Sequence, residues 1–192
     1  MQPWFRNRNH RVKNNLQQVT NLLSLQSSRL TDEEAKKAVT EALLRIEAMA
    51  LVHQRLYDGD RLVEINLSSF IPELIEGILR SYNYSHLQPE YRLDPIWLHV
   101  DSAIPMGLLI NELVTNSCKY AFPFSPEPVI KVTCQLKKNQ ILLELTDNGP
   151  SFDLSQKTKT FGLKLLQIFS AQLKAESGFE NKGTMFRLLF SK

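Results

Sequence analysis

Several features that mark other protein classes are scarce in this 192-residue sequence. It contains only two cysteines, Cys118 and Cys134, which make no disulfide framework, and no His/Cys cluster has the spacing of a zinc site. No apolar run approaches the roughly 20 residues that span a bilayer, and the polar, arginine-containing start does not resemble a signal peptide. These absences predict a soluble protein of the reducing cytoplasm, with no membrane segment in this chain.

The composition is that of a globular protein with an uneven charge distribution. Hydrophobic residues make up 43% and charged residues 22%, which argues against disordered, fibrous and collagen-like classes. The net charge is +3, but residues 1–31 carry five basic residues and no acidic one, and residues 32–192 carry 18 basic and 20 acidic residues. Such a basic arm can meet nucleic acid, an anionic membrane or an acidic protein surface, and electrostatics alone does not choose among them.

Two amphipathic helices are expected over residues 10–30 and 35–57, because apolar side chains recur there at helical spacing. Between them, Thr31 and Glu34 have the spacing of a capping box. The pattern predicts an antiparallel helical hairpin within residues 1–60. A hairpin alone buries only one seam, so we expect it to pair with a second copy into a four-helix bundle or to dock on the rest of the chain.

Residues 61–192 alternate short strands and helices, which predicts a second domain with a mixed sheet and makes the fold class α+β. The expected helix caps are Ser68 or Ser69 and Asp101 or Ser102. The expected strands cover residues 63–66, 91–93, 97–100, 129–136, 141–146, 177–180 and 185–190, and the expected helices cover 68–82, 102–121 and 161–173.

The expected helix over 102–121 carries the first candidate site. Glu112, Asn116 and Lys119 stand at i, i+4 and i+7 and share one polar stripe. An amide oxygen can ligate Mg²⁺, a lysine can neutralise phosphate, and a carboxylate can orient or deprotonate a nucleophile, so the combination suits a nucleotide. The alternative is an ordinary solvated helix face with paired charges.

Three glycine-containing segments could contribute to such a site. Asp147-Asn148-Gly149 ends an expected strand, where an aspartate can accept a hydrogen bond from an adenine amino group, although the same residues are common in turns. Gly162 and Leu163 begin a helix, whose free N–H groups can cradle phosphate. Gly183 and Thr184 precede the last strand and are a weaker signal.

His10 is the candidate nucleophile. It falls off the apolar seam of the first helix, within an unusually polar and cationic first turn. An exposed neutral imidazole is a competent nucleophile near neutral pH. The alternative is a surface histidine without a chemical role.

Five segments occur together in the order and spacing of a bacterial sensor histidine kinase transmitter. They are HRVKNNLQ at 10–17, NELVTNSCKYAF at 111–122, DNG at 147–149, FGLKLL at 161–166 and KGTMFRLLF at 182–190. Taken together, residues 7–190 most resemble the HisKA_2 family, whose phosphoacceptor histidine is followed by Arg-Val-Lys-Asn-Asn-Leu. The resemblance implies a dimerisation and phosphotransfer hairpin over 1–60, followed over 61–192 by a two-layer α/β sandwich of the Bergerat (GHKL) ATP-binding type.

The resemblance also implies roles for single residues. His10 would be the phosphorylated residue and Asn116 the Mg²⁺ ligand, and Glu112 is the candidate base because Arg11, directly after His10, cannot act as one. Residues 150–160 would form the ATP lid. The implied ATP contacts are Asn116, Lys119, Tyr120, Asp147, Gly149, Gly162, Leu163, Gly183 and Thr184.

The implied function is that of a two-component sensor histidine kinase. It would autophosphorylate His10 from ATP and Mg²⁺ and pass the phosphoryl group to an aspartate of a response regulator receiver domain. We expect a homodimer, a sensory domain that is absent from this chain or supplied upstream, and no nucleic-acid partner.

Three other functions fit parts of the sequence. A histidine phosphotransferase with a degenerate ATP site would keep the hairpin and His10, but it would not need Glu112, Asn116 and Lys119. A serine kinase of the anti-sigma type would share the ATP-binding fold without the first helix. A nucleic-acid-binding protein would need a recognition motif or an aromatic stacking platform, and the sequence offers neither.

Overall fold

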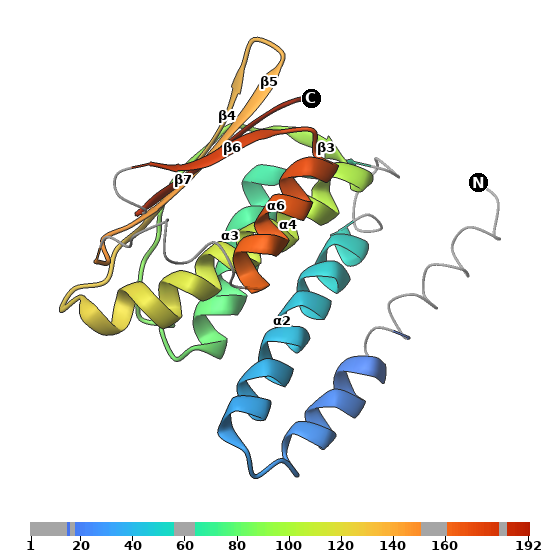
Figure 1. Ribbon diagram of the computed structural model, residues 1–192. Helices are drawn as coiled ribbons and strands as arrows, with labels where there is room; N and C mark the ends of the chain where they lie inside the picture. Colours follow the sequence, from blue (N-terminus) through green and yellow to red (C-terminus); the bar gives the residue numbers. More distant parts are fainter. Residues whose placement is uncertain (1–14, 16–17, 56–63, 151–160, 181–183) are drawn as a thin grey trace.

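The computed structural model describes residues 15, 18–55, 64–150, 161–180 and 184–192 (Figure 1). The chain forms a helical N-terminal part and a mixed α+β part, as the sequence predicts. Within the described residues, no helix combines the length and the apolar character needed to cross a membrane.

The N-terminal part contains two helical segments. Residues 18–27 are helical, residues 28–32 form a turn, and α2 (Glu33–Arg55) follows. The two segments run side by side in opposite directions in Figure 1, where α2 is cyan and the preceding segment is blue. The N-terminus of α2 is capped by Asp32, whose carboxylate accepts the Glu34 N–H at 2.8 Å, so the expected cap at Thr31 is displaced by one residue.

The main sheet has five strands in the order β2-β4-β5-β7-β6. Its strands are β2 (Glu90–Leu93), β4 (Ile130–Lys137), β5 (Gln140–Asp147), β6 (Glu176–Glu180) and β7 (Met185–Ser191). Only β2 and β4 are parallel, and the other neighbours pair antiparallel. The expected strands over 63–66 and 97–100 do not join this sheet, because β1 (Glu64–Asn66) and β3 (Trp97–His99) pair with each other.

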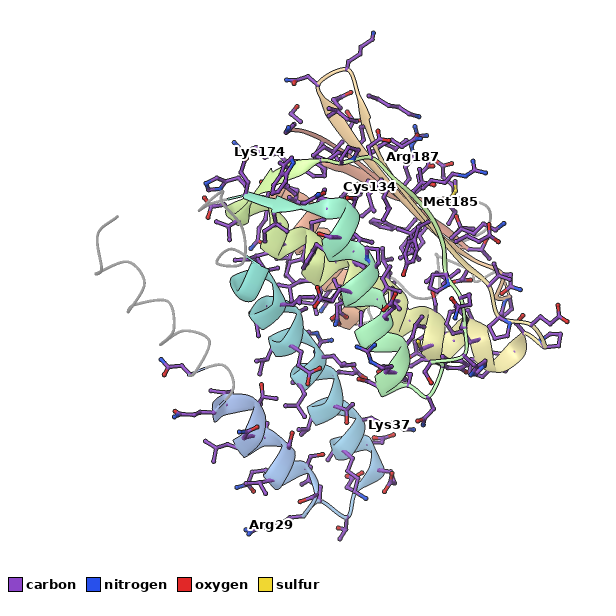
Figure 2. The ribbon with its side chains drawn as sticks, turned by 180° about the vertical axis from the view of Figure 1, so that it is seen from behind. Arg29, Lys37, Cys134, Lys174, Met185 and Arg187 are labelled. Carbon is purple, nitrogen blue, oxygen red and sulfur yellow. The ribbon has the colours of Figure 1, made fainter. Side chains whose placement is uncertain are left out.

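One face of the main sheet is buried and the other faces solvent. Along β4, Ile130, Val132 and Cys134 are buried, whereas the intervening Lys131 and Thr133 are not. Figure 2 shows Cys134 and Arg187 on this sheet; Arg187 is exposed and pairs with Glu144 and Glu180 across neighbouring strands. The alternation leaves a single apolar face for helices to cover.

Three helices cover that face: α3 (Leu67–Ser81), α4 (Val100–Asn116) and α6 (Phe161–Gln172) (Figure 1). Their caps differ from the expected ones. Asn66 caps α3 by accepting the Ser68 N–H at 3.1 Å, and the His99 ring nitrogen accepts the Asp101 N–H at 3.3 Å at the start of α4. Both helices therefore begin directly after a strand residue.

The helix α2 packs on α4 and α3 and extends their core. Ala48 and Val52 of α2 are fully buried and belong to the same hydrophobic cluster as the sheet residues. Gly107 of α4 makes the close approach possible, because a Cβ there would lie 3.0 Å from the Phe70 ring and 3.7 Å from Val52. The N-terminal part is thus anchored on the α+β part. The domain boundary near residue 60 stays a prediction.

Candidate functional site

The candidate site is built around the C-terminal end of α4. Asn116 is its last residue, and a single π-helical turn, η1 (Ser117–Ala121), and a short 3₁₀ turn, η2 (Phe122–Phe124), follow. Wide turns of this kind are rare and often mark functional positions. Lys119 is half-buried on this turn, whereas the ring of Tyr120 is largely exposed.

Asp147, the last residue of β5, lies against this turn. Its Oδ2 accepts a hydrogen bond from the Ser117 hydroxyl at 2.7 Å, and its Oδ1 accepts the Gly149 N–H at 3.0 Å. The Asp147 backbone N–H donates to the Thr184 carbonyl at 3.0 Å. The carboxylate is thereby held in one orientation by two donors, and further lone pairs stay available for a ligand amino group.

Ser117 was not among the predicted site residues. The helical pattern of 102–121 groups it with apolar side chains that face the sheet, and it is buried there. The sequence does contain one signal for a role of Ser117: it is a polar residue on the otherwise apolar side of this helix. Its hydroxyl has only one proton, and the distance to the Leu113 carbonyl, 3.3 Å, is longer than that to Asp147.

Gly149 sits where the chain passes directly over η1. A Cβ built on Gly149 would lie 2.6 Å from the Cα of Ala121 and closer still to its Cβ. No side chain fits in that space without a backbone shift, so glycine is required here. This contact brings the segment after Asp147 against the turn that carries Lys119.

The start of α6 lies beside Glu112 and Asn116. A Cβ on Gly162 would be 3.5 Å from Glu112 Oε2 and 3.8 Å from both amide atoms of Asn116. A side chain at this position would lie directly against the two polar groups, and glycine leaves them without that contact. Leu163, the neighbouring residue, is half-buried and packs against the hydrophobic core.

Glu112 and Lys119 both contact α2. Glu112 is only 3% exposed, and both of its carboxylate oxygens contact the Arg45 guanidinium, with Nη2 to Oε2 at 3.1 Å. The Lys119 ammonium forms an ion pair with Glu41. In addition, the Asn111 amide donates to the Leu44 carbonyl at 3.1 Å. Two of the three residues of the predicted polar stripe therefore contact α2, and the alternative of an ordinary solvated helix face is wrong.

The charges around this interface affect one another. Burial alone would lower the pKa of the Arg45 guanidinium, but its hydrogen bond and attraction to Glu112, together with Glu41, raise that pKa. Burial, aided by the negative charge of Glu41, raises the pKa of Tyr82 to about 12. Arg45 thus stays charged and Tyr82 stays neutral across the physiological range.

The polar groups present fit a magnesium nucleotide. The Asn116 amide supplies an oxygen of the type that Mg²⁺ prefers, and this side chain lies beside Gly162 at the start of α6. Lys119 supplies a positive charge on η1, the turn that follows Asn116. Asp147 supplies a hydrogen-bond acceptor at the end of β5. His10, Gly183 and residues 151–160 lie outside the described residues, so their expected roles stay predictions.

Comparison with a family model and with curated proteins finds histidine kinases in each case. The model of the HisKA_2 family, described as a histidine kinase, matches residues 8–82. The sensor histidine kinase PdtaS of Mycolicibacterium smegmatis is 30% identical over 184 residues, and PdtaS of Mycobacterium tuberculosis is 28% identical over 182 residues. Each alignment covers 90% of this chain but only 36% and 35% of the relatives, so the chain spans about a third of their length.

Solved structures give the same fold. The histidine kinase domain of the Erythrobacter litoralis blue-light-activated histidine kinase matches with a TM-score of 0.72 and 17% identity. The match covers 96% of this chain and 94% of that domain. At this identity the likeness concerns the fold alone, and it extends over both the helical and the α+β part. Family model, relatives and fold together support a bacterial sensor histidine kinase, to which this chain is similar over both its helical and its α+β part.

Proposed function

We propose that this chain is the transmitter of a two-component sensor histidine kinase: it phosphorylates His10 from Mg-ATP and passes the phosphoryl group to an aspartate of a response regulator. The observation that carries the proposal is the convergence at the end of α4. Asp147, held by Ser117 and Gly149, lies against η1, and Glu112 and Asn116 lie beside Gly162. A relay protein would need none of these groups.

Four described residues of the candidate site have roles in the proposal. Asp147 accepts a hydrogen bond from the adenine amino group, Asn116 holds Mg²⁺ through its amide oxygen, and Lys119 neutralises phosphate charge. Glu112 orients the imidazole or accepts its proton. Mg²⁺ would supply charge neutralisation on the phosphate oxygens. The work of the protein is positioning and electrostatic stabilisation, which dominate phosphoryl transfer.

The proposed first step is an in-line displacement. An imidazole nitrogen of His10 forms the new bond to the γ-phosphorus, the bond to the bridging oxygen breaks, and its electron pair leaves with ADP. The imidazole gives up one proton in the process, for which Glu112 is the acceptor. The phosphoryl group then moves to a receiver aspartate, and the basic residues Arg11 and Lys13 are suited to dock an acidic receiver surface.

The exposed side chains on residues 18–27 support the proposed homodimer. Leu22 and Leu25 are 62% and 63% exposed, and Val19 is 44% exposed. Apolar side chains at helical spacing that the chain itself leaves uncovered are suited to a partner helix. In the proposal, this side joins a second copy to complete a four-helix bundle.

The test is labelling with γ-³²P-ATP and Mg²⁺, comparing wild type with His10→Gln and Asn116→Ala. The expected result is acid-labile label on wild type that both substitutions abolish, because phosphohistidine is acid-labile and both residues are needed to form it. Addition of a receiver domain should then remove label from the kinase. An unlabelled wild type that also fails to bind ATP in a titration would overturn the proposal and favour a histidine phosphotransferase.

A further inference from the structure

Two groups of the proposed site, Lys119 and Glu112, are already engaged by α2. Glu41 pairs with the Lys119 ammonium, and Arg45 contacts both oxygens of Glu112. Glu41 and Arg45 stand one helical turn apart on α2, with 3.6 Å between Arg45 Nη2 and Glu41 Oε2. The helix α2 therefore places a carboxylate, Glu41, against the Lys119 ammonium and a guanidinium, Arg45, against the Glu112 carboxylate.

The contact at Glu112 is shielded from water, and the contact at Lys119 is partly shielded. The Glu112 side chain is 4% exposed and Arg45 18%, and Lys119 and Glu41 are 21% and 25% exposed. Charge pairs in such surroundings are screened less than pairs on an open surface. The Lys119–Glu41 pair therefore lowers the affinity of Lys119 for any other anion that approaches it.

A phosphate group and Glu41 compete for the same ammonium. An ammonium has three N–H donors, but two anions in contact with one nitrogen repel each other. Phosphate binding at Lys119 is thus favoured when Glu41 withdraws. Since Arg45 lies on the same helix, a withdrawal of α2 also separates Arg45 from Glu112.

We infer that Glu41 competes with the nucleotide phosphates for Lys119, so that the contact of α2 with α4 sets the affinity of the site for Mg-ATP. The inference rests on the proposed function, because it requires Lys119 to meet phosphate. Glu41 is a positioning residue in this scheme. It acts through Lys119 and touches no reacting atom.

The test measures binding by calorimetry on the full chain with two ligands, a non-hydrolysable Mg-ATP analogue and adenosine. Glu41→Gln should bind the ATP analogue about fivefold more tightly than wild type, because a partly buried charged pair no longer competes. Adenosine affinity should not change, because adenosine carries no phosphate. Glu34→Gln is the matched control, since it removes the same charge from an exposed position in the first turn of α2 and should behave as wild type.

A second variant guards against a trivial folding effect. Glu41→Asp keeps the charge but shortens the side chain by one methylene, so its affinity for the ATP analogue should fall between wild type and Glu41→Gln. Equal affinities of wild type and Glu41→Gln for the analogue would overturn the inference while leaving the proposed function intact. A tightening that adenosine or Glu34→Gln shares would also overturn it, because the effect would not be competition at Lys119. Loss of all nucleotide binding in wild type would instead remove the proposed function itself.

Discussion

The two ends of the proposed nucleotide site are held by different kinds of contact. At the adenine end, Asp147 is fixed by neutral donors, Ser117 and Gly149, that belong to the α+β part itself. At the phosphate end, Glu112 and Lys119 are fixed by charged partners on α2. In the proposed site, the two donors that hold the Asp147 carboxylate thus lie outside α2, whereas the contacts of Glu112 and Lys119 change when α2 moves.

This difference separates binding of the adenine base from contact with the phosphates. A rigid, hydrogen-bonded anchor gives binding with little reorganisation, so the base of the nucleotide can be recognised in any position of α2. Ion pairs between helices have two discrete arrangements, formed and broken, and can therefore be biased by a signal that moves one helix. Four predictions test this division.

The largest expected effect is on stability at the phosphate end. Arg45→Met would leave the Glu112 carboxylate buried without its partner, so the free energy of unfolding should fall by about 3 kcal/mol in urea titrations. The double variant Arg45→Met with Glu112→Gln should recover most of that loss, because no buried charge then remains. Arg187→Met removes an exposed arginine with two ion pairs and should cost less than about 1 kcal/mol. Equal losses for the two single variants would contradict a special role of the buried pair.

At the adenine end, the largest effect should come from the close approach of Gly149 to Ala121. Gly149→Ala forces the backbone apart and should lower the free energy of unfolding by about 2 kcal/mol and abolish measurable adenosine binding. Gly178→Ala is the control, because a Cβ there meets nothing within 4 Å. Normal adenosine binding by Gly149→Ala would show that this contact does not shape the adenine end.

A smaller effect is expected when one donor to Asp147 is removed. Ser117→Ala should weaken adenosine and the ATP analogue by the same factor, about fivefold, since one hydrogen bond to a carboxylate is lost and the phosphate end is untouched. Ser170→Ala, which removes a buried hydroxyl that has no hydrogen-bond partner among the described residues, is the control and should leave both affinities unchanged. A loss confined to the ATP analogue would mean that the two ends are not separable.

The smallest effect concerns salt. The ratio of the affinities of Glu41→Gln and wild type for the ATP analogue should shrink from about five to about two between about 0.1 and about 0.5 M salt, because the competing ion pair is partly exposed and is screened. Adenosine affinity should stay constant over the same range in calorimetric titrations. A salt-independent ratio would indicate that Glu41 acts through packing and not through charge.

Sequence periodicity predicts most of the fold because strands and helices each bury one side. The strands over 129–136 and 141–146 are confirmed as β4 and β5, joined by a turn in which Lys138 adopts a φ of 58°. Periodicity does not identify the capping residue. Asn66 and His99 lie two or three positions before the expected caps, since several neighbouring polar side chains can cap and the end of the preceding strand decides which one does.

The sequence predicts candidate residues of the site but not their partners on other elements. A helical wheel groups Glu112, Asn116 and Lys119 on one side of the helix, but it contains no information on which element covers that side. Glu41 and Arg45 lie off the apolar stripe of their own helix, so nothing in the pattern of α2 singles them out. Ser117 was missed because its partner, Asp147, comes from the sheet, and a wheel of one helix does not represent a contact between layers.

The alternating charges on α2 and α4 also determine how the two helices can move. The helices run antiparallel, since Glu41 meets Lys119 whereas Arg45, further along α2, meets Glu112, which precedes Lys119. Sliding α2 by one turn in one direction would bring Arg45 to Lys119, and sliding it in the other would bring Glu41 to Glu112. Both shifts put like charges together, so the ion pairs lock the register against translation. Rotating or lifting α2 separates the pairs without bringing like charges together, so the interface opens more readily by these motions than by sliding.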